Sequence, residues 1–192
     1  MTLPATIGPL WLVRHSLPVE PYGSGAICYG SLDIDVEPKA LAESVETLHR
    51  ELPDNALIIT SPMRRCLALA EALHERAQTR RITTDPRLRE LDFGRWEGLG
   101  WDAIDRDALD AWAGNFMSYR EHGGEAVNQL AERIAAVLED IASRKQIQQT
   151  APTVIVTHNG PIRMIKAITQ SGRATVGAMP GLRYGQCERL SG

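Results

Sequence analysis

The sequence has no long apolar run and no excess of positive charge. No segment approaches the roughly 20 apolar residues of a membrane-spanning helix, so we expect no membrane partner. The formal net charge of −3 provides no basic surface for nucleic acid. A chain of this charge that binds an anion must concentrate its Arg and His side chains locally, so clusters of these residues are the first place to look for function.

Cysteine is scarce and dispersed. Cys28, Cys66 and Cys187 form no C-x-x-C pair, which argues against both a disulfide framework and a zinc site. The first residues, Met-Thr-Leu-Pro-Ala, lack the basic and apolar regions of a signal peptide. We therefore expect reduced thiols and a cytoplasmic location.

The 192 residues and their 43% apolar content suit one domain covering residues 1–192. Short apolar runs predict buried strands of a parallel sheet at residues 10–13, 56–59 and 153–156, with a weaker one at 81–84. Apolar positions spaced by three and four predict helices over about 41–52, 63–73 and 127–141. This alternation predicts an α/β fold: a three-layer sandwich around a mostly parallel sheet.

Two segments fit neither pattern. Residues 96–124 hold most of the Trp residues and read as a small helical insertion over the active-site edge of the sheet. Residues 16–38 are rich in Pro and Gly and read as a long ordered loop, which inside a compact domain is often functional.

The three strong strands each end in residues suited to phosphate. The first ends in Arg14-His15, the second leads to Arg64, and the third leads to His158-Asn159. Ligands of open parallel sheets bind outside the carboxyl ends of the strands. If these strands are neighbours, the side chains converge on one point.

The second strand end carries a further signal. Ser61 suits a helix N-cap and Pro62 a first helical position. Arg64 and Arg65 then fall in the first turn, where a cation is disfavoured by about 0.3–1 kcal/mol unless an anion binds there. We expect Arg64 to bind that anion and Arg65 to be solvated or paired with an acid.

Paired histidines also occur in metal sites, and a lone His at a strand end is more often structural. His15 and His158 lack H-x-H or H-x-x-x-H spacing, and arginines lie beside them in sequence. We therefore expect no metal.

Five ordered segments resemble signatures of the histidine phosphatase superfamily, also called phosphoglycerate mutase-like. They span about residues 10–165 and are similar to its L-V-R-H-G, S-P-L-x-R, L-x-E-x-x-F-G-x-W-E-G, G-G-E-S and V-S-H-G-G-x-I-R motifs. The matching segments are Leu12–Ser16, Ser61–Arg65, Leu88–Gly98, Gly123–Glu125 and Val156–Arg163. Ser16 replaces the usual Gly, and Leu17-Pro18 replaces the usual acidic and hydroxyl residues.

The resemblance implies specific roles. His15 would be the nucleophile, with Arg14, Arg64 and His158 completing the phosphate pocket. Glu90, which alone would be read as a surface carboxylate, would donate a proton to the leaving oxygen. Asn159 stands where the family usually has Gly, and we expect it to bind substrate. The family resemblance implies no metal and no cofactor.

The substrate expected is a small phosphorylated metabolite. The loop from Cys28 to Val36 resembles the bacterial α-ribazole phosphatase-like branch, which suggests α-ribazole 5'-phosphate of the cobalamin pathway. A phosphoglycerate mutase-type isomerase and a noncatalytic phospho-ligand binding module stay open as alternatives, as does a homodimer.

Overall fold

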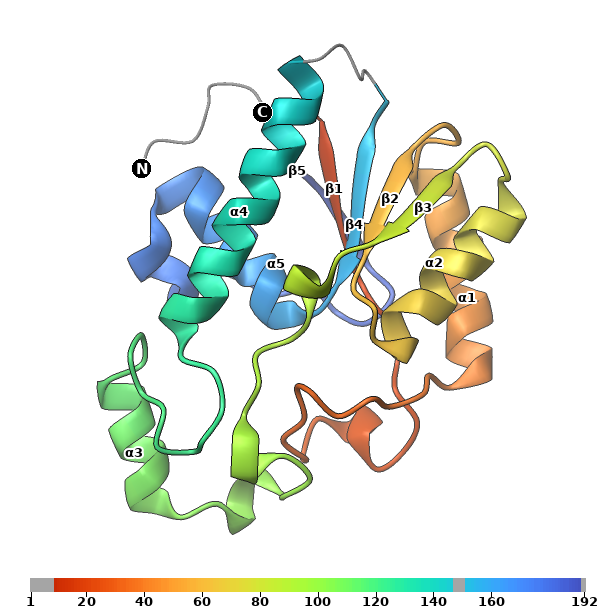
Figure 1. Cartoon of the computed structure of the whole chain (residues 1–192). Coiled ribbons are helices and arrows are strands. Elements are labelled where there is room, and N and C mark those ends of the chain that lie inside the picture. Colours follow the sequence, from red (N-terminus) through yellow and green to blue (C-terminus); the bar gives the residue numbers. More distant parts are fainter. Residues whose placement is uncertain (1–8, 147–150, 191–192) are drawn as a thin grey trace.

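The computed structural model describes residues 9–146 and 151–190, and a five-stranded sheet forms its centre (Figure 1). The strand order is β3-β2-β4-β1-β5, with β5 antiparallel to β1 and the other neighbouring pairs parallel. The strands are β1 (Leu10–Arg14), β2 (Leu57–Thr60), β3 (Arg81–Thr84), β4 (Thr153–Thr157) and β5 (Cys187–Leu190). The four predicted strands and the mostly parallel sheet are confirmed.

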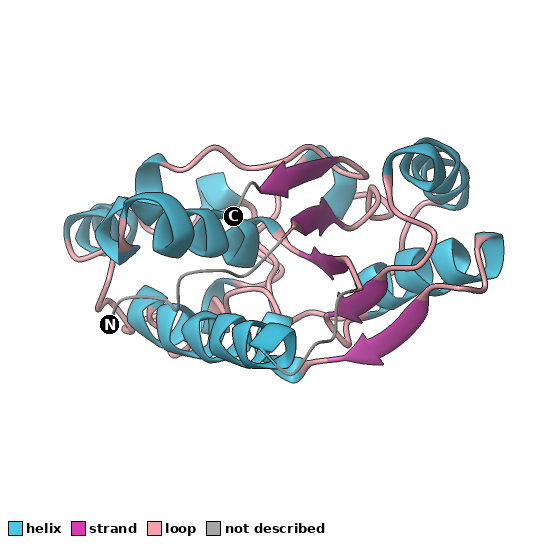
Figure 2. Ribbon diagram, turned by 90° about the horizontal axis from the view of Figure 1, so that it is seen from above, coloured by secondary structure: helices cyan, strands magenta, loops and turns pink. Residues whose placement is uncertain are grey.

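Helices cover both faces of this sheet (Figure 2). Successive side chains of a strand point to opposite faces. Val13 and Val154 therefore pack with α1 (Pro38–Glu51) and α2 (Arg64–Arg76). Leu12 and Ile155 pack with α4 (Val127–Gln146) and α5 (Asn159–Lys166). The predicted three-layer sandwich is confirmed.

The apolar pattern of the sequence predicted neither α5 nor β5. Gly160 and Pro161 lie in the first turn of α5, and both residue types are typical of turns, so the sequence does not indicate this helix of only 8 residues. In β5 the central Glu188 and Arg189 break the apolar pattern that marked the other strands. β5 pairs with β1 at the sheet edge, where polar side chains are tolerated.

Two long connections lie beyond the carboxyl ends of the parallel strands, at the lower end of the sheet in Figure 1. The first, between β1 and α1, is irregular apart from a 3-10 turn at Tyr22–Ser24. The second, between β3 and α4, holds α3 (Arg106–Gly114) and 3-10 turns at Pro86–Leu88, Gly94–Trp96 and Trp101–Ala103. An isolated bridge between Ile27 and Gly100 joins the two connections.

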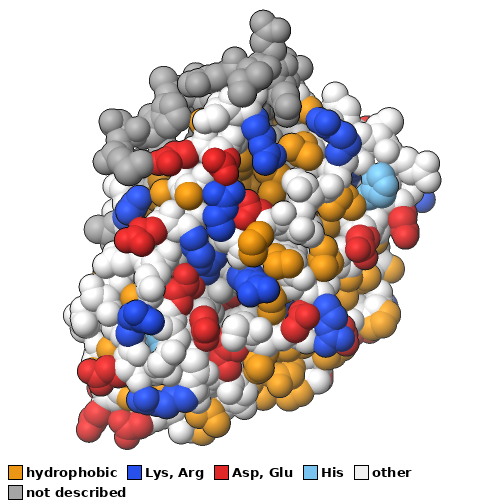
Figure 3. All heavy atoms as spheres, in the orientation of Figure 1, with side chains coloured by type: hydrophobic (Ala, Val, Ile, Leu, Met, Phe, Trp, Pro, Cys, Tyr) orange, Lys and Arg blue, Asp and Glu red, His pale blue; other side chains and the backbone are white. Residues whose placement is uncertain are grey.

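The surface carries charge of both signs. On the face shown in Figure 3, Lys and Arg side chains are interspersed with Asp and Glu. Arg87, for example, pairs with Asp85 and with Asp140 of α4 at 2.7 Å each. No helix within residues 9–146 and 151–190 is long and apolar enough to cross a membrane.

Candidate active site

The strand order brings the predicted site residues together. β4 lies between β1 and β2, and Arg14 is in register with Thr157, so His15 and His158 follow side by side. Their ring centroids are 5.1 Å apart. The predicted convergence of Arg14, His15 and His158 is confirmed.

Nε2 of the His15 imidazole has no hydrogen-bond partner among residues 9–146 and 151–190. The Nδ1–H of the same ring donates to the carbonyl oxygen of Ser16 at 2.8 Å, which leaves the lone pair of Nε2 available. The side chain is buried, and burial, followed by the positive charges of Arg65 and Arg14, lowers the pKa of His15 well below its usual value. The ring is therefore neutral at physiological pH, as a nitrogen nucleophile must be.

His158 is also held neutral. The Nε–H of Arg65 donates to Nδ1 of His158 at 3.1 Å, and an arginine can only donate. The His158 proton therefore lies on Nε2, which donates to the hydroxyl of Ser61 at 2.9 Å. Burial, followed by the charge of Arg65, lowers the pKa of His158 well below its usual value.

The arginine at the second strand end is Arg65, not Arg64. Arg64 is half-exposed and forms ion pairs with Asp33 and Asp35 at 3.5 and 3.1 Å. Asp33 also accepts the backbone N–H of Arg64 at 2.7 Å, so a carboxylate of the chain already occupies the N-terminus of α2. The N-cap of this helix is Met63, two residues later than Ser61. The prediction that Arg64 binds the anion is therefore not supported by the geometry.

Arg65 is instead completely buried. Its two terminal nitrogens donate to the carbonyl oxygens of Leu32 and Gly30, both at 2.7 Å, while Nε contacts His158. The expectation that Arg65 is solvated or paired with an acid is wrong. The final Arg of the S-P-L-x-R pattern falls on Arg65. The alignment with that motif therefore indicates Arg65 as the site residue, whereas the capping argument favoured Arg64.

Arg14 extends the positive charge on the other side of His15. Its Nη1 donates to the carbonyl oxygen of Leu182 at 2.8 Å, and its guanidinium stacks over the ring of Tyr184 at 3.8 Å. Its Nε is buried and has no hydrogen-bond partner within the described chain. A buried unpaired donor is costly, and a phosphate oxygen would satisfy it.

Glu90 is held at the N-terminus of α5. Both of its carboxylate oxygens accept the backbone N–H of Gly160 at 3.1 Å, and Oε1 also accepts that of Leu91 at 2.9 Å. A Cβ atom at position 160 would lie only 2.2 Å from Oε1 of Glu90. Glycine at this position is what permits the carboxylate to approach the helix so closely.

Asn159 lies in the wall of the same cavity. Its Oδ1 accepts the backbone N–H of Leu182 at 3.0 Å, so it fixes the segment whose carbonyl oxygen binds Arg14. The amide nitrogen has no hydrogen-bond partner within the part of the chain that the structure describes, and the substrate-binding role of Asn159 stays a prediction.

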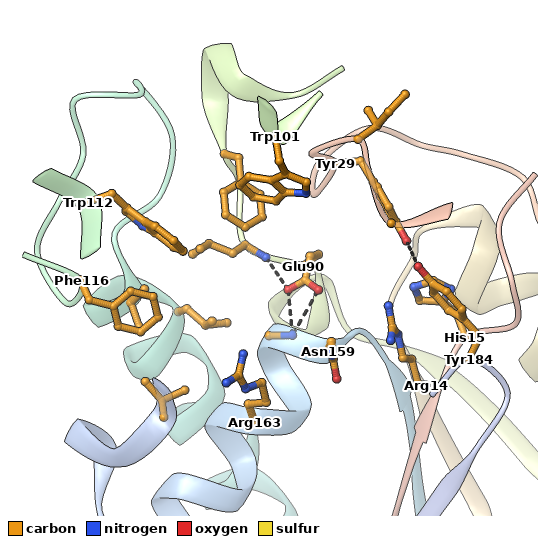
Figure 4. Close-up of a pocket in the computed structure, with 18 residues that line it drawn as sticks. Arg14, His15, Tyr29, Glu90, Trp101, Trp112, Phe116, Asn159, Arg163 and Tyr184 are labelled. Carbon is orange, nitrogen blue, oxygen red and sulfur yellow. Dashed lines mark hydrogen bonds between the residues drawn. The ribbon is translucent and has the colours of Figure 1, made fainter. Parts of the chain in front are cut away.

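A cavity of about 330 Å³ is lined by Arg14, His15, Glu90 and Asn159, whereas the fully buried Arg65 and His158 are not part of its wall. Figure 4 shows the Glu90 carboxylate between His15 and Arg14 on one side and Trp112 and Phe116 on the other. Much of its wall is apolar or aromatic, formed by Ile27, Leu91, Phe93, Trp101, Trp112, Phe116, Val127, Leu130 and Val176. The cavity thus has a charged end suited to phosphate and an apolar end suited to the rest of a substrate.

The sequence motifs assign no role to three further polar residues of the cavity. The hydroxyls of Tyr29 and Tyr184 are hydrogen-bonded at 2.9 Å and join the first long loop to the segment before β5. Arg163 of α5 also lines the cavity, and its Nε donates to the carbonyl oxygen of Met179 at 2.7 Å. Tyr29 lay in a motif already noted, whereas Tyr184 lies outside every motif and reaches the site only through the fold.

The α/β fold and the two adjacent histidines at the strand ends define a class of phosphate-handling proteins. The family model described as "Histidine phosphatase superfamily (branch 1)" matches residues 10–184, and the chain belongs to this family. It is similar to a glucosyl-3-phosphoglycerate phosphatase of Mycolicibacterium vanbaalenii, with 31% identity over 82% of this chain and 72% of the relative. It is also similar to a metal-independent phosphoserine phosphatase of Arabidopsis thaliana, with 26% identity over 85% of this chain and 69% of the relative.

A solved structure gives the same family relation. A mycobacterial glucosyl-3-phosphoglycerate phosphatase in complex with VO3 superposes with a TM-score of 0.78 and 30% identity, covering 95% of this chain and 92% of the other. The relatives compared are phosphatases named for phosphosugar and phosphoserine substrates, and they do not specifically support the α-ribazole phosphatase branch.

Proposed function

We propose that this protein hydrolyses a phosphate monoester through a phosphohistidine formed at His15. The observation that carries the proposal is the free Nε2 of a buried, neutral His15 whose Nδ1–H is fixed on Ser16. Arg14 and Arg65 flank this imidazole and supply the positive charge that a transferring phosphoryl group requires.

The proposed reaction has two transfers. Nε2 of His15 bonds to phosphorus while the bond from phosphorus to the leaving oxygen breaks, and the departing electron pair takes a proton from Glu90. Water then attacks phosphorus and gives its proton back to Glu90, the nitrogen–phosphorus bond breaks, and inorganic phosphate leaves. Arg14 binds the nonbridging oxygens in both steps, and Arg65, hydrogen-bonded to His158, contributes positive charge from behind the site.

The first experiment is direct trapping of the phosphoenzyme. The native protein, quenched during turnover of a ³²P-labelled phosphomonoester, should carry an acid-labile, base-stable label. His15→Ala should lose this label and nearly all turnover, and EDTA should leave native activity unchanged. Turnover that survives in His15→Ala would refute the proposed nucleophile.

The cavity supports a substrate whose leaving group carries an uncharged ring. Trp101, Trp112 and Phe116 can pack on such a ring, since aromatic pairs add about 0.5–1.5 kcal/mol beyond area burial. α-Ribazole 5'-phosphate carries an aromatic base and is our first candidate. This candidate also rests on the resemblance of the Cys28–Val36 loop.

A second candidate follows from Arg163. This cation lines the apolar end of the cavity, and a substrate with a carboxylate, such as glucosyl-3-phosphoglycerate, would pair with it. The mycobacterial relatives are named for that substrate. Measuring kcat/KM for both compounds, together with phosphoserine and 3-phosphoglycerate, ranks the candidates.

Two other functions remain testable in the same assays. A phosphoglycerate mutase-type isomerase would return the phosphoryl group to another substrate hydroxyl and would need a bisphosphate primer. A noncatalytic phospho-ligand binding module would bind the substrates without releasing phosphate. Release of inorganic phosphate in proportion to the alcohol product separates hydrolysis from both.

A further inference from the structure

Arg133 of α4 makes a saturated set of hydrogen bonds around the backbone that carries Glu90. Its Nε and Nη2 donate to the two carboxylate oxygens of Glu125 at 2.7 and 2.8 Å. The second Nη2 proton goes to the carbonyl oxygen of Glu90 at 3.1 Å. Nη1 donates to the carbonyl oxygens of Arg87 and Arg89. All five N–H groups of a guanidinium therefore have acceptors.

Glu90 has no regular secondary structure to support its backbone. The 3-10 turn at Pro86–Leu88 ends just before it, and the segment up to Gly94 is irregular. The Arg133 side chain binds the carbonyl oxygens of this segment, which would accept backbone N–H groups in a helix or sheet. Beyond Glu90, the backbone N–H of Glu125 donates to the carbonyl oxygen of Asp92 at 2.8 Å. The loop is thus held both before and after the carboxyl group.

The Arg133–Glu125 pair does not reach the substrate. Both side chains are mostly buried, at 18% and 17% exposure, and neither residue lines the cavity. A bidentate pair with this burial fixes orientation more firmly than an exposed ion pair. Its hydrogen-bond contact with the site runs through the backbone of Glu90. The charge of Arg133 also contributes to lowering the pKa of His158, so the test must separate positioning of Glu90 from this electrostatic effect.

We infer that Arg133 and Glu125 are positioning residues that hold Glu90 in place for proton transfer to the leaving oxygen, an inference that rests on the proposed function. A misplacement of about 1 Å can cost 10²-fold in rate. The cost falls only on the step that needs the proton. An alkoxide leaves poorly without protonation, whereas a nitrophenolate leaves as a stable anion.

The dependence on the leaving group separates positioning from a merely structural role. We would measure kcat/KM of Glu125→Gln and Arg133→Lys with benzyl phosphate and with p-nitrophenyl phosphate. Glu125→Gln should lower the benzyl phosphate value about 10- to 100-fold, within the range that general acid catalysis contributes. The p-nitrophenyl phosphate value should change less than about threefold. Equal losses with both substrates would overturn the inference.

A control variant and a double-variant comparison complete the test. Asp140→Asn removes another ion pair of α4, that with Arg87, and should leave both substrates unaffected. Glu125→Gln keeps the side-chain volume, so it tests the inference even where Arg133→Lys does not fold. In a Glu90→Gln background, Glu125→Gln should cause no further loss with benzyl phosphate, and additive losses would contradict the positioning role.

Failure of the proposed function would look different. In that case the native protein would turn over neither substrate and would form no phosphoenzyme. Native turnover of both substrates together with a normal profile for Glu125→Gln would reject the positioning role alone.

Discussion

The Nε–H of Arg65 donates to Nδ1 of His158 over 3.1 Å, deep beneath the candidate phosphate site. This one contact fixes the tautomer of His158, because an arginine cannot accept the bond. It also places the positive charge of Arg65 beside both histidines and contributes to lowering the pKa of each. Arg65 therefore acts on the site through charge as well as through the hydrogen bond.

Neighbouring arginines offer a matched test of this arrangement. Arg65→Met should lower kcat about 10²–10³-fold, the usual cost of one lost charge-stabilising donor. Arg64→Met removes an exposed cation that pairs with Asp33 and Asp35, so kcat should change less than about threefold. Steady-state kinetics of the two variants give the comparison. A larger loss for Arg64→Met than for Arg65→Met would restore Arg64 as the phosphate ligand.

Stability should separate the same two variants. Removing Arg65 deprives the carbonyl oxygens of the half-buried Leu32 and the buried Gly30 of this donor, and a buried acceptor left unsatisfied costs about 1–3 kcal/mol. Urea unfolding should therefore show a clear loss for Arg65→Met and little change for Arg64→Met. The kinetics are compared without urea, at a temperature at which circular dichroism shows that both variants are folded.

The convergence of the residues that follow the strands could be predicted from the sequence, because parallel neighbouring strands have their carboxyl ends at the same edge of the sheet. Short Val/Ile/Leu runs located β1, β2 and β4, and their order placed His15 beside His158. The choice between Arg64 and Arg65 failed because it depends on Asp33, which lies about 30 residues away and caps α2 from another loop. Local capping rules do not contain that long-range contact.

Residues that position other residues were the hardest to predict. Glu97 sits in a recognised motif, yet its role appears only in the fold. Its carboxylate accepts the backbone N–H groups of Ser31 and Leu32 at 2.7 and 2.8 Å, and the same short loop provides the carbonyl oxygens that bind Arg65. A motif marks such a carboxylate but does not name its partner.

Gly160→Ala should selectively displace Glu90. The added Cβ would meet Oε1 of Glu90 at 2.2 Å, so the carboxylate must leave the N-terminus of α5. We expect a fall in kcat of about 10²-fold for alkyl phosphates, from misplacement of the proton donor. The binding of inorganic phosphate as a competitive inhibitor should change little. Gly114→Ala, in α3 with open space around its Cβ position, is the control, and equal losses in both variants would refute the prediction.

Stability should fall as the pH drops below about 6.5, the ordinary pKa of an unfolded histidine. The folded-state pKa values of His15, His122 and His158 all lie below it, mainly because of burial. The unfolded chain therefore binds more protons in that window, and each group costs at most about 1.4 kcal/mol per pH unit, only until the pH reaches its own folded-state pKa. Urea midpoints at pH 7.5 and 5.5 measure the loss, which should be smaller in His122→Asn. An identical pH dependence in that variant would exclude His122 as a contributor.

The apolar end of the cavity should select the leaving group. Trp112 packs edge-on against Phe116 at a centroid distance of 5.1 Å, and both line the cavity. Trp112→Leu should raise KM for benzyl phosphate about tenfold, which corresponds to the roughly 1.4 kcal/mol of a lost aromatic contact. KM for ethyl phosphate, whose leaving group is also an alkoxide but lacks a ring, should change less than about twofold. Trp11→Leu replaces a tryptophan of β1 that lies outside the cavity wall, so it should leave the ratio of the two KM values unaltered. If Trp112→Leu shifts both KM values together, the ring does not bind at this wall, and the carboxylate-bearing candidate that pairs with Arg163 becomes the better substrate.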